Sequence, residues 1–212
     1  MAWALVEPLG FGRYFPNGDF VGWREKLKKC PHLDEHYRGS TVAFKFTSAE
    51  EPLMDCEIPE EFRMEKSCKD LADMIIINSG LLAITEPLKN IIEALEPGVH
   101  QFFPLKMTMP RGKVYPEPYF GMIILRKLDS FVPEKSSDFH TFTSYTGEKY
   151  YHFDETKKSI SRLALSGEKI KGTHLWREKY VQTPNIFMSD ELRNAIKEAG
   201  LTIFRHHPVK VV

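Results

Sequence analysis

Residues 81–107 read LLAITEPLKNIIEALEPGVHQFFPLKM, and this stretch carries the clearest structural signal in the chain. Thr85 is of a type that caps helices, and the Glu86-Pro87 pair after it places an acid and a proline in the first turn, where helices favour them. Apolar residues then recur on one helical face, at Leu88, Ile91, Ile92 and Leu95. The stretch therefore predicts an amphipathic helix that begins near residue 86.

The residues around this helix predict a strand on each side of it. The short apolar run LLAI precedes the cap, and Pro97-Gly98 ends the helix. The run VHQFFPLKM then has the composition of a strand. Proline cannot donate a ladder hydrogen bond, so Pro104 is expected at a sheet edge or at a bulge. Together these features predict a strand–helix–strand unit.

The same order of features returns 104 residues later, in NIFMSDELRNAIKEAGLTIFRHHPVKVV (residues 185–212). Ser189 is the cap, Gly200 ends the helix, and Pro208 lies in the second strand. The apolar face of this helix consists of Leu192, Ala195, Ile196 and Ala199. Two copies are too few for a solenoid, so we predict two related strand–helix–strand units.

The rest of the chain reads mostly as β-structure. Five short β-rich segments lie between the two units: YFGMIIL, FHTFTSY, KYYHF, SISRLAL and IKGTHLW. Near the N-terminus, TVAFKF (residues 41–46) alternates as a strand does, and PNGD (residues 16–19) reads as a turn. The expected fold is α+β, with mostly antiparallel β-structure on which the two units pack. It is expected as a single domain of residues 1–212, or as two lobes of about residues 1–110 and 111–212.

The composition favours a cytoplasmic globular protein. Lys and Arg together number 29, and so do Asp and Glu, so the net charge is zero. A neutral chain argues against a nucleic-acid binder and against a polybasic membrane tether. No window approaches the ~18 consecutive apolar residues of a membrane span. The three cysteines form no CxxC pair, which favours reduced thiols at Cys30, Cys56 and Cys68.

Two groups of residues invite a catalytic or metal-binding interpretation. CPHLDEH (residues 30–36) contains a cysteine and two histidines, but zinc needs a fourth ligand and no second Cys/His pair has a suitable spacing. His206 and His207 point to opposite faces of a predicted strand. Cys68 could be a nucleophile, but it has no recognisable partner. No metal, no cofactor and no catalytic residue is expected, so the chain is predicted to bind rather than to catalyse.

The two strand–helix–strand stretches, with YFGMIILRKLDSFVPEKS and IKGTHLWREK, resemble immunity family eleven of bacterial polymorphic-toxin systems. The segment YFPNGDFVGW is also similar to that family. The resemblance spans roughly Tyr14 to the end of the chain and is weakest over residues 50–73. It implies an immunity protein that binds and neutralises a cognate toxin C-terminal domain in the cytoplasm and so protects the producer and its kin. The protein is expected to be a monomer when free.

Two other functions stay open from the residues alone. One is a small enzyme that reverses a modification made by a toxin. The other is a regulatory interaction module unconnected with toxins. An enzyme would protect at trace amounts, whereas an inhibitor would protect only up to a one-to-one ratio. A neighbouring gene for a toxin would distinguish the inhibitor from the regulatory module.

One window is strongly acidic. Residues 50–73 hold nine acidic and three basic residues, a net charge of −6, and are expected as a partly irregular connection leading into a helix. Inhibitors of toxins that attack nucleic acid often present carboxylates, because opposite potentials speed encounter. An ordinary solvated loop is the competing interpretation. The window's candidate toxin-binding residues are Glu57, Ile58, Glu60, Glu61, Phe62 and Glu65.

Overall fold

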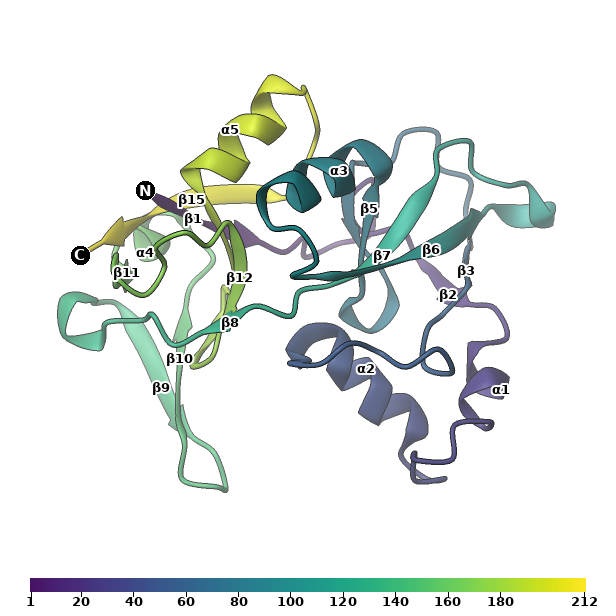
Figure 1. Ribbon diagram of the computed structural model, residues 1–212, viewed down its shortest axis with the longest axis horizontal. Helices are drawn as coiled ribbons and strands as arrows, with labels where there is room; N and C mark the ends of the chain where they lie inside the picture. Colours follow the sequence, from purple (N-terminus) through teal and green to yellow (C-terminus); the bar gives the residue numbers. More distant parts are fainter. The chain divides into compact units, whose positions relative to one another are not determined.

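The computed structural model describes all 212 residues, and they form two compact units (Figure 1). Unit 1 comprises Met1–Glu7, Arg126–Gly200 and Phe204–Val212, and unit 2 comprises Pro8–Leu125 and Leu201–Ile203. Eight of the twelve strand pairs are antiparallel and four are parallel. The expected α+β class is confirmed, although the sheets are mixed rather than purely antiparallel. No helix is both long enough and apolar enough to cross a membrane.

Unit 2 is built on a six-stranded sheet of order β2-β3-β6-β7-β5-β4. Its strands are β2 (Gly18–Phe20), β3 (Glu61–Met64), β4 (Met74–Ile76), β5 (Leu82–Thr85), β6 (Gln101–Thr108) and β7 (Tyr119–Ile123). Its α-helices are α1 (Trp23–Leu27), α2 (Arg38–Ser48) and α3 (Glu86–Leu95), and short 3-10 turns are η1 (Asn78–Gly80) and η2 (Pro110–Gly112).

Unit 1 has a six-stranded sheet of order β11-β15-β1-β14-β12-β8 and a three-stranded sheet of order β13-β10-β9. The strands of the larger sheet are β1 (Ala2–Val6), β8 (Lys127–Leu128), β11 (Ala164–Leu165), β12 (Leu175–Glu178), β14 (Ile186–Ser189) and β15 (Arg205–Val211). The smaller sheet contains β9 (Phe139–Thr143), β10 (Lys149–Phe153) and β13 (Val181–Thr183). The helical segments are η3 (Pro133–Lys135), α4 (Lys157–Ile160) and α5 (Asp190–Glu198).

The two predicted strand–helix–strand units are confirmed as β5-α3-β6 and β14-α5-β15. In each, the two strands run parallel and one antiparallel strand lies between them: β7 in unit 2 and β1 in unit 1. Each is extended in the same way, by an antiparallel strand on one side (β4 or β12) and by a parallel strand on the other (β3 or β11). The chain therefore contains one five-stranded topology twice.

The register of the two sheets repeats as well. Pro104 of β6 lies opposite Phe120, and Pro208 of β15 lies opposite Trp3. A cation from the helix covers this central aromatic in each unit. Lys89 Nζ lies 5.3 Å from the centroid of the Phe120 ring, and the Arg193 guanidinium lies 4.4 Å from that of Trp3. Because such contacts add to apolar burial, each helix is held to its sheet by the same kind of pair.

The helix caps differ in detail between the two repeats. The Ser189 hydroxyl accepts a hydrogen bond from the Leu192 N–H at 3.1 Å, as an N-cap side chain should. The Thr85 hydroxyl instead donates to the Asp73 carboxylate at 2.9 Å.

Pro104 was expected at an edge or a bulge. It lies in β6, but β3 pairs with β6 only from Lys106 onward, so no ladder bond on that side is lost at the proline.

The expected strand TVAFKF is wrong, because these residues belong to helix α2. Val42 and Phe46 are four residues apart and are 0% and 1% exposed, whereas Phe44 between them is 70% exposed. The apolar residues of this segment alternate as those of a strand do. The side chains that are buried, however, have the i, i+4 spacing of a helix.

Three other local predictions also need correction. PNGD is not a turn: Gly18 and Asp19 begin β2, and a Cβ at Gly18 would lie 2.3 Å from the Arg63 carbonyl oxygen, so glycine is needed for close strand packing. The window of residues 50–73 contains β3 and leads into β4 rather than into a helix. The segment SISRLAL begins with the end of helix α4 and closes with the short strand β11.

Candidate interaction site

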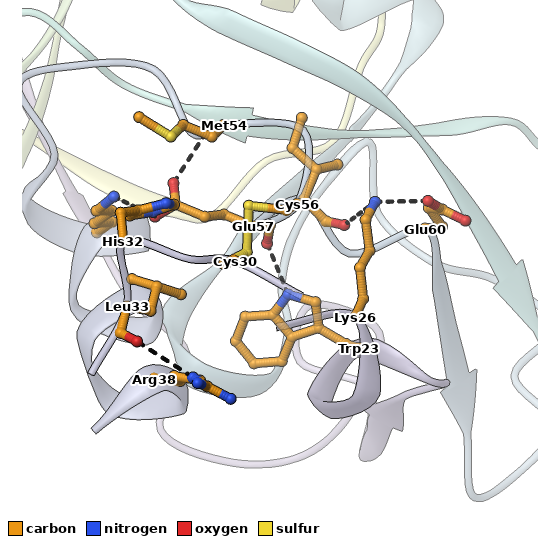
Figure 2. Close-up of a disulfide and its surroundings, with 12 residues drawn as sticks. Trp23, Lys26, Cys30, His32, Leu33, Arg38, Met54, Cys56, Glu57 and Glu60 are labelled. Atoms are coloured by element: carbon orange, nitrogen blue, oxygen red, sulfur yellow. Dashed lines mark hydrogen bonds and ion pairs between the residues drawn. A yellow bond between two sulfur atoms is a disulfide. The ribbon is translucent and has the colours of Figure 1, made fainter. Parts of the chain in front are cut away.

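The acidic window is bound to helix α1 by hydrogen bonds from two side chains of that helix (Figure 2). The Trp23 indole N–H donates to the Glu57 carbonyl oxygen at 2.7 Å. Lys26 Nζ donates to the Ile58 carbonyl oxygen at 2.9 Å and to the Glu60 carboxylate at 2.6 Å. Much of the window lacks regular secondary structure, and these bonds satisfy backbone groups that no ladder reaches. The window is thus a docked segment rather than a free loop.

Glu57 is the buried centre of this segment, with 0% of its surface exposed. Its carboxylate accepts a hydrogen bond from Lys45 of α2 and one from the Met54 N–H at 2.9 Å, and His32 Nε2 lies 2.9 Å from it. Burial alone would raise the pKa of Glu57, but these hydrogen bonds outweigh it and leave the pKa lowered. Glu57 is therefore an ionised internal tie and has no surface to offer a partner.

A disulfide between Cys30 and Cys56 fixes the same segment a second time, as Figure 2 shows. Their Cα atoms are 5.6 Å apart, a usual distance for such a bond. The expectation of reduced thiols is wrong for these two residues, and only Cys68 is free. The Cys30 thiolate is thus unavailable to zinc, and no group of three or more His, Cys, Asp or Glu side chains could hold a metal ion.

Phe62 is the residue of the window that lies in the aromatic core. It is 0% exposed, and its ring centroid is 5.7 Å from that of Phe20. Trp23 and Phe46 stack next to this pair, with centroids 5.4 Å apart. Ile58 is partly buried and packs against the same core. Phe62 therefore cannot be the exposed aromatic anchor, and Ile58 offers only part of its side chain.

The other three candidate residues reach the surface, and each has a partner in the chain. The Glu60 side chain is 76% exposed, and the hydrogen bond from Lys26 lowers its pKa. Burial acts to raise the pKa of Glu61, but bonds from Thr108, Lys106 and Arg63 lower it overall. The exposed Glu65 carboxylate accepts a bond from Asn17 at 2.5 Å. The net charge of the window therefore does not become a bare acidic patch.

Helix α1 stands between two surface clefts of unit 2. One, of about 560 Å³, is lined by residues that include Lys26, Asp55 and Glu60. The other, of about 810 Å³, lies between α1 and α2, and its lining includes Arg24 and Arg38. The sequence analysis did not single out these two arginines. The cleft that they line is formed partly by α2, and residues 41–46 of that helix were predicted to be a strand. The one local signal was the basic run around WREKLKK.

Comparison with known families assigns the chain to a class of immunity proteins. The family model that matches is described as immunity protein family (Imm11), and it covers residues 21–211, so the chain belongs to this family. The resemblance found from the sequence is thereby confirmed, and membership supports a toxin-neutralising role. A search of curated proteins finds no match.

Proposed function

We propose that this protein is an immunity protein that binds a cognate toxin C-terminal domain in the cytoplasm and neutralises it, protecting the producer and its kin. The observation that carries the proposal is the family match, which spans both strand–helix–strand repeats and the acidic window. The action proposed is that of an inhibitor, which occupies the toxin rather than repairing its damage.

The toxin-binding face we propose is the surface of unit 2 around α1. The exposed carboxylates of Glu60 and Glu65 and the partly exposed carboxylate of Glu61 lie along the acidic window and would meet a basic surface of the toxin. Complementary potentials of this kind mainly raise the association rate and fix orientation. Glu57, Ile58 and Phe62 serve the face indirectly, because they hold the window against the core.

A titration of toxin activity separates this function from its alternatives. The purified toxin domain is mixed with increasing amounts of the protein, and its residual activity is measured. A stoichiometric inhibitor abolishes the toxin's activity at one equivalent. Below one equivalent, the activity that remains is proportional to the toxin left unbound. Protection of the toxin's target at trace amounts would instead identify an enzyme that reverses the modification. No effect at any ratio would favour a regulatory module unconnected with toxins.

The acidic face has its own test, by charge reversal. The triple variant Glu60→Lys, Glu61→Lys, Glu65→Lys is expected to slow association with the toxin domain, most strongly at low salt. The matched control makes the same charge change on exposed glutamates of unit 1: Glu134→Lys, Glu168→Lys and Glu198→Lys. If both variants fold and associate at the same rate, the acidic window is not part of the interface.

A further inference from the structure

The cleft between α1 and α2 has an apolar floor. Phe20, Trp23 and Leu27 line it from one side and Ala43 of α2 from the other, within an open volume of about 810 Å³. Phe20 and Trp23 pack edge to face, with ring centroids 5.0 Å apart, and are fixed in the core. The floor is therefore preformed and needs no rearrangement before it receives a ligand.

Two guanidinium groups line this cleft without a carboxylate partner. Arg24 is exposed, and its side chain makes no hydrogen bond or ion pair within the chain. Arg38 donates only its Nε–H, to the Leu33 carbonyl oxygen at 3.3 Å, so its two terminal nitrogens are not engaged. Of the carboxylates in the lining, Asp19 accepts bonds from Asn78 and from the Phe20 N–H, and Glu35 is exposed.

These groups define what the cleft is suited to bind. A guanidinium presents a planar set of donors that matches a carboxylate in geometry and charge. Two of them above an aromatic floor suit an acidic side chain with apolar neighbours. Lys28, also in the lining, is already paired with Glu25 at 2.8 Å and adds less.

The outer face of α2 next to the cleft is free of charge. Tyr37 and Phe44 are 66% and 70% exposed, and Ser40 and Thr41 lie between them on the same helical face. A solvated helix normally presents charged residues on its outer face. Exposed aromatic side chains with hydroxyl neighbours are typical of protein-binding surfaces.

We propose that the α1–α2 cleft and the outer face of α2 receive a loop of the cognate toxin domain that carries at least one carboxylate between apolar side chains. The inference rests on the proposed function and adds the chemistry of the contact. The carboxylate pairs with Arg24 and Arg38, its apolar neighbours cover the aromatic floor, and the adjoining toxin surface covers Tyr37 and Phe44. With the carboxylates on the other side of α1, the whole face presents both signs of charge.

The test measures the dissociation constant of the toxin domain for the wild-type protein and for three variants, with far-UV circular dichroism confirming the fold of each. Arg24→Glu and Arg38→Glu are each expected to weaken binding by about 30-fold, as loss of an interfacial arginine hot spot does. The double variant Tyr37→Ser, Phe44→Ser is expected to weaken binding by about 10-fold or more. The control, Arg111→Glu with Lys113→Glu on an exposed loop of the same unit, is expected to stay within about twofold.

The outcomes separate this inference from the function beneath it. If the wild-type protein binds the toxin and the arginine variants bind equally well, the cleft assignment is overturned and the proposed function stands. If only the arginine variants lose affinity, the contact is with a small anionic group and the assignment to a loop fails. If the wild-type protein does not bind the toxin at all, the proposed function itself fails. Should Arg38→Glu unfold, Arg24→Glu alone decides, because Arg24 has no partner to lose.

Discussion

Replacing Glu57 by Gln removes the one fully buried charge that ties the acidic window to α2. Gln keeps the shape of the side chain and an oxygen that can accept from the Met54 N–H. It loses the charge that faces Lys45 and His32, whose side chains are 31% and 33% exposed. The variant therefore tests whether the window is held by an ionised internal tie.

The size of the effect follows from the partial exposure of the two partners. Removing one member of a buried ion pair costs about 3–5 kcal/mol, because the other charge stays buried without compensation. Lys45 and His32 retain some contact with water, which places the expected loss at the lower end of that range. We expect the free energy of unfolding to fall by about 3 kcal/mol at pH 7.

Urea unfolding followed by circular dichroism measures this loss of stability. The pH dependence of the loss shows whether the ionised form of Glu57 is the stabilising one. The folded pKa of Glu57 is below the ordinary value of 4.5, so its stabilisation is present above that value and is lost as the pH falls through the lowered pKa. The gap between wild type and Glu57→Gln should be constant near neutrality and shrink in acid. The exposed control Glu60→Gln should change stability little. Equal stability of Glu57→Gln and wild type at pH 7, or a gap that widens in acid, would show that Glu57 is not an ionised tie.

Three further outcomes are expected. The variant Cys30→Ser, Cys56→Ser should lose about 3.5 kcal/mol of unfolding free energy, because the bond closes a loop with a sequence separation of 26; an unchanged melting temperature would contradict this. Ile92 and Ile196 are only 1% and 3% exposed, so Ile92→Asp and Ile196→Asp each bury a charge and should lower the free energy of unfolding by about 3–5 kcal/mol. Two variants that melt like the wild type would contradict the packing of the two helices. Chelators should leave folding and protection unchanged; stoichiometric zinc whose removal unfolds the protein would contradict the prediction that no structural metal is bound.

The two strand–helix–strand repeats could be predicted because their signals are local. A cap residue, an apolar face at helical spacing and a stop at Pro97-Gly98 or Gly200 all lie within one short stretch. The strand between the two parallel strands of each repeat could not be predicted in the same way. β7 follows β6 in sequence, whereas β1 comes from the other end of the chain, and only long-range pairing places it.

The candidate site was harder to predict, because its chemistry depends on partners distant in sequence. Glu57 is neutralised by Lys45 and Glu61 contacts Lys106, so counting charges within residues 50–73 overstated the acidity of the surface. The disulfide joins Cys30 to Cys56 with no spacing motif between them. The α1–α2 cleft could not be predicted, because the alternating pattern at residues 41–46 indicated a strand where the structure has helix α2.

The proposed inhibition requires that this chain bind a toxin domain directly. The most direct measurement is isothermal titration calorimetry of the purified protein against the toxin C-terminal domain encoded by the neighbouring gene, with the toxin's activity assayed in the same samples. A saturable one-to-one complex, with activity falling in parallel with complex formation, is the expected result. Absence of binding to that domain, or loss of its effect without formation of a complex, would contradict the proposed inhibition.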